Sequence, residues 1–227
     1  LHFRGGREAI DKVAYPTIEE FYADLARVYR EEIADLAAAG CRYLQIDETN
    51  LAYLCDPALR AHAQSLGEDP DQLLKTYAKL LNDTMSGKPD DMVICIHLCR
   101  GNYGGAWVAE GGYEPVAEVL LSEINANGYF LEYDSDRAGG FEPLRFLPKG
   151  KIAVLGLITT KDGKLETKDT IKRRIEEAAK IVPIDQLALS PQCGFASGIE
   201  GMAMTIEQEI AKLKLVNETA REVWADA

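Results

Sequence analysis

The chain has 227 residues, of which 47% are hydrophobic and 27% are charged, and this length and composition are typical of one globular domain with a substantial core. Its 25 basic and 37 acidic residues give a net charge of −12, which argues against the basic surface that nucleic acid or an anionic membrane requires. No apolar run approaches the ~20 residues of a membrane span, and the first residues carry no signal-peptide pattern. The odd number of cysteines, five, favours a reducing cytoplasm in which the thiols are buried or bound to metal.

Helix-like and strand-like segments alternate along the sequence. The first helix is predicted over residues 17–39, where Thr17 and Glu20 form a capping box and hydrophobic residues recur at helical spacing. A second helix begins at Asp69, a capping residue that is followed by Pro70 in the first turn. Further helices are predicted over residues 115–124, 167–181 and 205–224, the last with a capping box of Thr205 and Gln208, and strands over residues 42–47, 92–99, 129–133, 152–158 and 187–190.

Strands that are apolar on both faces and alternate with helices predict an α/β fold, in which helices cover a parallel sheet. The five predicted strands leave two architectures open. One is a complete, doubly wound sheet of five strands, and the other is the later part of a (β/α)₈ barrel, which has eight strands. In both architectures the functional residues lie at the carboxyl ends of the strands.

The predicted strand ends are unusually polar. His97 and Cys99 share one face of their strand, because alternate residues of a strand point the same way. Glu132 lies at the end of the next strand, and Cys193 follows the last one. Two thiolates, an imidazole and a carboxylate form a plausible tetrahedral zinc site, although spacing alone leaves open that they are ordinary buried residues. The remaining cysteines are expected to be structural: Cys41, Cys55 and Cys95.

Asp47 and Glu48 form a second polar strand end, and alternation places Asp47 on one face with Gln45. A carboxylate on the interior side of a strand end is costly unless it is paired or binds a cation. Two roles follow for this pair. Asp47 and Glu48 are candidate substrate-binding residues that recognise an ammonium or guanidinium group, and the alternative is a salt bridge to a neighbouring strand end.

Residues 100–112, RGNYGGAWVAEGG, contain five glycines together with Tyr103 and Trp107. The spacing is not G-x-G-x-x-G, and the segment does not lead directly from a strand into a helix, so the dinucleotide-binding pattern is absent. Beside His97 and Cys99, a flexible aromatic segment suits a lid or a substrate platform, with an ordinary glycine-rich loop as the alternative.

Four segments, in chain order, resemble a known family: IHLC, FLEYD, LGLIT and LSPQCGFAS. They are similar to the C-terminal catalytic barrel of the cobalamin-independent methionine synthases, and above all to the short, single-barrel branch described as methionine-synthase-like. The resemblance extends from HFRGG to the last predicted helix, and the combination of H-x-C, F-L-E and P-x-C-G is specific.

The resemblance implies a (β/α)₈ TIM barrel of the methionine synthase/uroporphyrinogen decarboxylase type, with Zn²⁺ as cofactor. The zinc ligands of the family match His97, Cys99, Glu132 and Cys193, and the aspartate that holds the amino group of homocysteine matches Asp47. The implied activity is that of a cytoplasmic methyltransferase whose substrates are small molecules. It moves a methyl group from a donor of the 5-methyltetrahydrofolate type to the thiol of homocysteine, which forms methionine.

Two departures from the family pattern bear on the methyl donor. Full-length methionine synthases carry an Asp-Ile-His segment after the seventh barrel strand, and its histidine resembles a proton donor, whereas this chain has Thr159, Thr160 and Lys161 there. The loop over residues 101–112 is also longer than in those enzymes. An epoxide:thiol alkyltransferase of the coenzyme M type uses the same zinc–thiolate chemistry and is therefore the alternative activity. A non-catalytic zinc-binding fragment is a third candidate, whereas the intact ligand set argues against a metal-free decarboxylase.

The resemblance also predicts how much of the barrel the chain holds. Three barrel strands of the family precede the segment that matches LHFRGG, so residues 1–227 are expected to form the C-terminal portion of a single catalytic barrel domain, its last five β/α units. Because soluble proteins avoid two unpaired parallel edges, we expect a homo-oligomer or association with the missing N-terminal part, and a catalytically crippled chain on its own. Neither nucleic acid nor a membrane is an expected partner.

Overall fold

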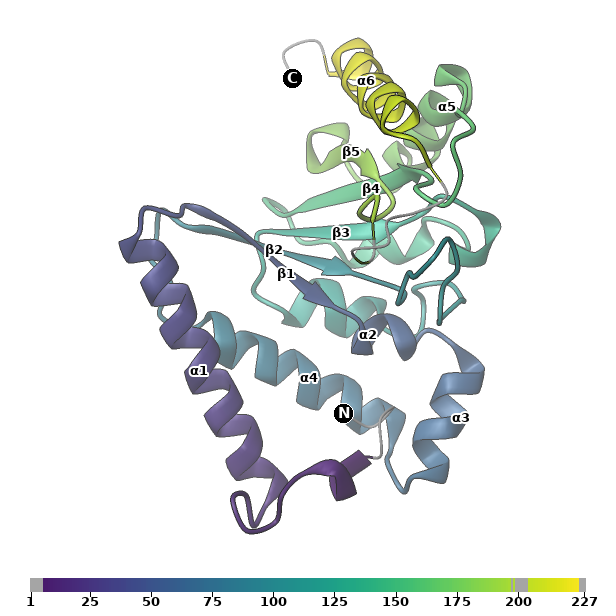
Figure 1. Cartoon of the computed structure of the whole chain (residues 1–227). Helices are drawn as coiled ribbons and strands as arrows, with labels where there is room; N and C mark the ends of the chain where they lie inside the picture. Colours follow the sequence, from purple (N-terminus) through teal and green to yellow (C-terminus); the bar gives the residue numbers. More distant parts are fainter. Residues whose placement is uncertain (1–5, 197, 199–203, 225–227) are drawn as a thin grey trace.

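The computed structural model describes residues 6–196, 198 and 204–224, and helices alternate with strands along the chain (Figure 1). The α-helices are α1 (Ile18–Ala38), α2 (Asn50–Tyr53), α3 (Pro57–Ser65), α4 (Pro70–Met85), α5 (Lys168–Ala179) and α6 (Ile206–Val223). The strands are β1 (Tyr43–Glu48), β2 (Val93–Leu98), β3 (Gly128–Glu132), β4 (Ile152–Ile158) and β5 (Leu187–Pro191). None of the described helices is long and apolar enough to cross a membrane.

The strands lie in the sheet in the order β1-β2-β3-β4-β5, and each strand pairs in parallel with the next. A doubly wound sheet reverses direction within its strand order, whereas a (β/α)₈ barrel adds each new strand on the same side of the last. The order seen in Figure 1 is that of five consecutive barrel units and not that of the doubly wound alternative.

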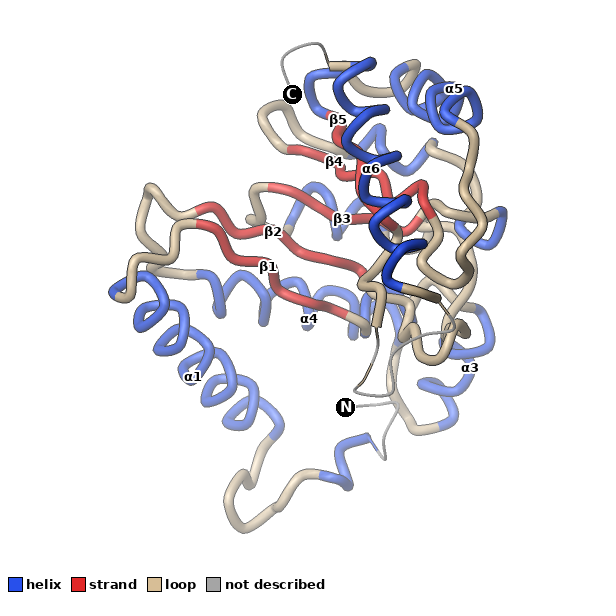
Figure 2. Tube along the Cα trace, turned by 45° about the horizontal axis from the view of Figure 1, so that its top comes forward, coloured by secondary structure: helices blue, strands red, loops and turns tan. Residues whose placement is uncertain are grey.

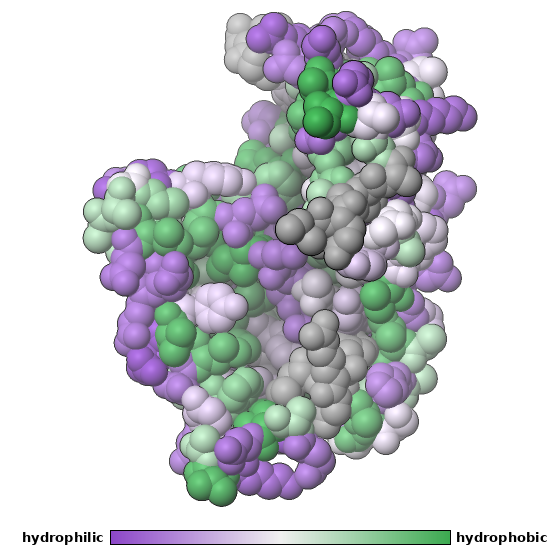
Figure 3. Space-filling view, in the orientation of Figure 1, coloured by the Kyte–Doolittle hydropathy of each residue, from purple (hydrophilic) through white to green (hydrophobic). Residues whose placement is uncertain are grey.

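The sheet has one covered face and one open face. Figures 1 and 2 show α4 running along β1 and β2, with α1 beside it, and α5 and α6 beside β4 and β5. On the covered face, Ile94, Leu98 and Tyr129 are 0% exposed. On the open face, Gln45 and Asp47 of β1 are exposed, because the sheet does not close around them within the described residues. Figure 3 shows this side of the molecule, with hydrophobic side chains in the recess between α1 and the strands and polar ones along the outer edge of α1.

Both predicted capping boxes are present. The hydroxyl of Thr17 accepts a hydrogen bond from the backbone N–H of Glu20 at the start of α1, and Thr205 and Gln208 make the same arrangement in α6. Asp69 caps α4 with its carboxylate, ahead of a proline in the first turn. These helix starts depend on residues only a few positions apart, and the sequence therefore predicts them.

The helix predicted over residues 115–124 is shorter in the structure, where residues 117 and 118 are α-helical and lead into the short π-helix η2 (Val119–Glu123). The Tyr129 hydroxyl, on β3, lies 2.7 Å from the carbonyl oxygen of Ile124 and 3.3 Å from that of Leu121. A side chain from the sheet therefore bonds carbonyls at the end of the helical segment, where no amide of the helix reaches them. The structure also adds α2, and at the start of α3 Asp56 and a following proline repeat the signal that marks the start of α4.

Candidate metal centre

Neighbouring strands bring three of the predicted ligands together. His97 and Cys99 occupy alternate positions at the end of β2, on the open face of the sheet. Since His97 pairs with Phe130 of β3, Glu132 lies two residues further along β3 on the same face and level with Cys99. His97, Cys99 and Glu132 are 7%, 8% and 0% exposed, so three polar side chains are buried side by side.

Cys193 arrives from β5, which two strands separate from β2. The chain turns across the open face after β5, where the pairing of β4 with β5 shifts between Gly156 and Ile158. Gly156 makes this crossing possible, because a Cβ at that position would stand 2.8 Å from the Cα of Gln192. Gln192 is fixed by its backbone N–H, which donates to the carbonyl of Ile158 at 2.8 Å, and by its side-chain oxygen, which accepts from Oγ1 of Thr160 at 2.9 Å.

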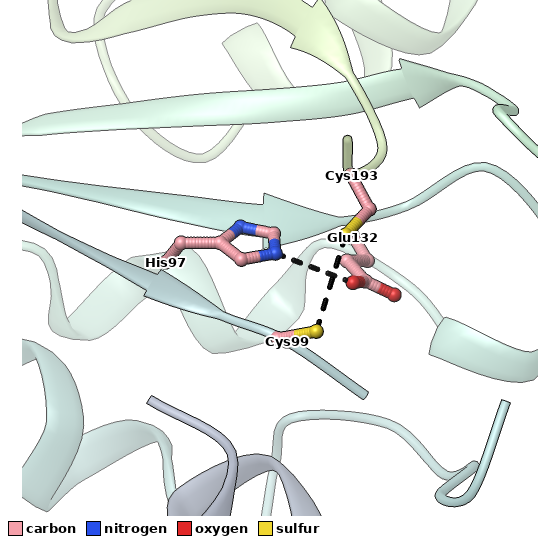
Figure 4. Close-up of side chains that lie close together, drawn as sticks. All are labelled: His97, Cys99, Glu132 and Cys193. Carbon is pink, nitrogen blue, oxygen red and sulfur yellow. Dashed lines mark hydrogen bonds and ion pairs between the residues drawn. The ribbon is translucent and has the colours of Figure 1, made fainter. Parts of the chain in front are cut away.

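The four predicted ligands converge, as Figure 4 shows. His97, Cys99, Glu132 and Cys193 each offer one ligand atom, and these atoms all lie within 4.8 Å of one another. The two sulfur atoms are 3.9 Å apart, and Nε2 of His97 is 3.5 Å from Oε1 of Glu132. Ligand atoms at ~2.0–2.3 Å from a tetrahedral zinc ion stand about 3.3–3.8 Å from each other, and the sulfur–sulfur and nitrogen–oxygen distances are close to this spacing. Nε2 of His97 is also buried without a hydrogen-bond partner among the described residues, which suits a nitrogen that binds a metal.

The clustered side chains change one another's proton affinities. The contact between the two thiols lowers the pKa of Cys99, and the same contact, together with burial, raises the pKa of Cys193. Burial opposes protonation of His97, but the polar contacts and the charges of the neighbouring Cys99 and Glu132 outweigh it and raise the pKa of His97 to about 9. The direction of these shifts favours the thiolate form of Cys99, and thiolate is the form of cysteine that binds metals.

Glu132 is held by three groups that the sequence-based prediction lacks. Its Oε1 accepts hydrogen bonds from Nδ2 of Asn102 at 2.6 Å and from the backbone N–H of Arg100 at 3.3 Å. Its Oε2 accepts from Nη2 of Arg137 at 3.1 Å, and the same nitrogen is 2.9 Å from Asp134. A buried carboxylate is costly unless such donors surround it. Asn102 and Arg100 belong to the glycine-rich segment beside the ligand strand, which is the one signal in the sequence that points to them.

The structure separates Asp47 from Glu48. Asp47 lies on the open face with its side chain 63% exposed, and its Oδ1 is 3.9 Å from Nε2 of His97. Burial and the neighbouring thiolate raise the pKa of Asp47. Glu48 is buried on the other face, where it accepts hydrogen bonds from the backbone N–H groups of Leu51 at 2.7 Å and Asn50 at 3.1 Å, and burial raises its pKa to about 7. Only Asp47 therefore lies near the candidate ligands, and the substrate contact of Glu48 stays a prediction.

A cavity of about 210 Å³ opens on the same face, beside the cluster. His97 and Cys193 form part of its wall, and the other lining residues are apolar or neutral and polar: Gln45, Phe130, Ser190, Pro191, Gln192 and Gly194. A small molecule in this cavity would reach one ligand nitrogen and one ligand sulfur.

The other three cysteines lie outside the cluster. Cys55 and Cys95 are buried, and burial raises the pKa of both thiols, that of Cys55 to about 12. Cys41 is partly buried, with its sulfur 3.1 Å from the carbonyl oxygen of Tyr43.

Comparison with known proteins gives a consistent picture. The family model described as "Cobalamin-independent synthase, Catalytic domain" matches residues 15–222. The uncharacterized protein YxjH of Bacillus subtilis is 48% identical over 96% of this chain, and the chain spans 58% of its length. The crystal structure of a candidate vitamin-B12-independent methionine synthase from Listeria monocytogenes is 40% identical, with a TM-score of 0.72 over 94% of this chain and 57% of that one. The 5-methyltetrahydropteroyltriglutamate–homocysteine methyltransferase of Bacillus licheniformis is 25% identical over 90% of this chain and 24% of its own length.

Proposed function

The chain belongs to the cobalamin-independent methionine synthase family, and on this basis we propose that it is part of a methyltransferase that methylates the thiol of homocysteine to form methionine. The convergence of His97, Cys99, Glu132 and Cys193 is the observation that carries the proposal. We propose Zn²⁺ as the ion, since two thiolates, an imidazole and a carboxylate are its preferred donors. A thiol bound to zinc is deprotonated at neutral pH and remains a nucleophile.

The residues on the open face would bind and orient the substrate. The side chain of homocysteine fits the cavity of about 210 Å³ beside His97 and Cys193. The exposed carboxylate of Asp47, 3.9 Å from His97, would hold the ammonium group. A carboxylate attracts an ammonium group and repels a sulfonate, so this placement favours homocysteine over a thiol of the coenzyme M type. The epoxide:thiol alkyltransferase is therefore the weaker alternative.

Glu132 is the hardest of the four ligands, and we propose that it gives way when the substrate thiol binds. Its carboxylate would not be left unpaired, because Asn102 and Arg137 already donate hydrogen bonds to it. The exchange would thus require a small movement of one side chain rather than the exposure of a buried charge.

A donor of the 5-methyltetrahydrofolate type is the proposed source of the methyl group. Full-length relatives have a histidine that resembles a proton donor, whereas this chain has Thr159, Thr160 and Lys161 at that position. The experiment therefore includes a panel of methyl donors. We also propose that residues 1–227 belong to a single catalytic barrel domain and that full activity needs a completed barrel, since β1 and β5 each pair with one strand among the described residues. Reduced Cys99 and Cys193 would suit the cytoplasm.

Two measurements test the proposal. Elemental analysis of the purified chain should find zinc in equimolar amount. With one member of the methyl-donor panel, homocysteine should then be converted to methionine. This activity would be measured for two proteins, the chain alone and the chain joined to the additional strands of a relative. A protein without metal, or one that alkylates a thiol with an epoxide but forms no methionine with any donor, would contradict the proposed function.

A further inference from the structure

Asn102 contacts two of the four candidate ligands. Its Nδ2 is 2.6 Å from Oε1 of Glu132 and 3.6 Å from Sγ of Cys99. Its Oδ1 accepts a hydrogen bond from the ammonium group of Lys161. Because an ammonium group can only donate, Lys161 determines which end of the amide carries the oxygen and thereby turns the NH₂ group toward the ligands.

The backbone that carries Asn102 requires glycine at both ends of the loop over residues 101–112. Gly101 has φ +73, and a Cβ there would stand 2.4 Å from the hydroxyl oxygen of Tyr53. Gly111 has φ +113, and a Cβ there would stand 2.4 Å from the carbonyl oxygen of Cys55. Any residue other than glycine at these two positions would strain the backbone and would also clash with its neighbours, so both glycines are needed for the course of the loop past the cluster.

Two cations fasten the loop to the surroundings of Glu132. Nζ of Lys161 lies 3.3 Å from the carbonyl oxygen of Ala106 and 5.5 Å from the ring centre of Trp107. The guanidinium of Arg137 lies 4.6 Å from the centre of the same ring, and Nη2 of Arg137 also holds Glu132. Cations over an indole ring are attracted to it. The loop and the ligand cluster therefore share the same two cations.

We propose that Asn102 is a positioning residue of the metal centre. Its amide holds Glu132 and Cys99 in their ligating orientation, Lys161 orients the amide, and the loop over residues 101–112 and the ligand set form one coupled unit. The inference rests on the proposed metal centre. The N–H···S bond withdraws electron density from the thiolate, and the N–H···O bond fixes the carboxylate. Loss of an outer partner of this kind typically lowers metal affinity about 10–100-fold.

Cobalt(II) is the probe for this inference, because thiolate ligands give it near-ultraviolet charge-transfer bands whose energy follows the electron density on sulfur. We would titrate the whole chain with Co²⁺ and compare three substitutions, Asn102→Ala, Lys161→Met and Tyr103→Ala. Tyr103→Ala is the matched control, because Tyr103 lies in the same loop, is 64% exposed and is not one of the four candidate ligands. Circular dichroism would establish that each variant is folded.

Asn102→Ala should move the charge-transfer band to lower energy and weaken Co²⁺ binding at least about tenfold. Lys161→Met should shift both in the same direction, and it carries the test if Asn102→Ala does not fold. Tyr103→Ala should match the wild type. The inference would be overturned if folded Asn102→Ala kept the band energy and the Co²⁺ affinity of the wild type, or if Tyr103→Ala changed them equally. If Lys161→Met left both quantities unchanged, the orienting role of Lys161 would be overturned. A wild-type chain without thiolate bands would instead refute the metal centre, and the inference with it.

Discussion

Gly156→Ala tests whether the crossing of the chain after β5 builds the metal centre. A Cβ at position 156 would stand 2.8 Å from Cα of Gln192, 3.0 Å from the carbonyl oxygen of Leu131 and 3.2 Å from that of Pro191. All three are backbone atoms, so no side-chain rotation relieves the contact. Carbon atoms settle at about 3.5–4.0 Å from one another, and the crossing segment would therefore retreat by about 1 Å. Metal sites hold their ligand distances to within about 0.2 Å, so this retreat, one residue before Cys193, removes a ligand.

The expected result is a loss of zinc affinity of at least about tenfold in a protein that still folds, since overpacking costs about 1–3 kcal/mol. Competition with a chromophoric chelator would measure the affinity, and thermal denaturation the stability. Gly150→Ala is the matched control, because Gly150 has φ +82 but a Cβ there would meet nothing within 4 Å. It should lose about 1 kcal/mol of stability and keep its zinc affinity. Wild-type affinity in folded Gly156→Ala would refute the role of the crossing.

Three further predictions concern single side chains. Cys193→Ser should remove zinc and methyl transfer together, and a metal-free variant that retained activity would exclude the proposed chemistry. Asp47→Asn should raise the KM for homocysteine about 10–100-fold, because a charge-assisted hydrogen bond is lost, and it should leave the zinc content unchanged. Steady-state kinetics and a zinc assay would measure both, and an unchanged KM or a loss of zinc would contradict this role of Asp47. Burial raises the pKa of Glu48 from 4.5 to about 7. Between these two pH values the folded chain keeps the proton of Glu48 and the unfolded chain has released it, so stability falls as the pH rises from about 4.5 to about 7. Relative to Glu48→Gln, the wild type should lose about 3 kcal/mol between about pH 5 and about pH 8 in urea denaturation, and parallel pH profiles of the two proteins would count against this.

Local causes account for the parts of the fold that the sequence predicts correctly. Thr17 and Glu20 are three positions apart and settle the start of α1 without help from the rest of the molecule. The alternation of His97 and Cys99 along β2 likewise needs only the geometry of a strand. The five strands are confirmed with small shifts at their ends, and their sequential order excludes the doubly wound sheet, which the pattern alone had left open.

Tertiary contacts account for part of what the sequence does not predict. The hydroxyl of Tyr129 bonds the carbonyl oxygen of Ile124 at the end of the expected helix, whose last residues form a π-helix. Gly156 looks like an ordinary strand glycine in the sequence, and only the crossing of Gln192 over it shows why a side chain is excluded. Glu48 is a different case, because its cause is local: the strand's alternation turns it to the face opposite Asp47, where its carboxylate accepts hydrogen bonds from the first amides of α2.

The charge distribution explains how so many acidic groups coexist at this end of the sheet. The thiolate of Cys99 and the carboxylate of Glu132 lie in a buried environment, where like charges repel strongly. Two arginines supply the opposite charge. Arg137 binds Glu132 directly, while Arg100 is 0% exposed, lies 4.6 Å from the ring centre of Tyr113 and makes no side-chain hydrogen bond among the described residues. A buried guanidinium without hydrogen bonds is costly by itself, and the ring of Tyr113 and the charge of Glu132 offset part of that cost. The cations that stabilise the ligand set thus come from the two loops that follow β2 and β3, the same strands that carry His97, Cys99 and Glu132.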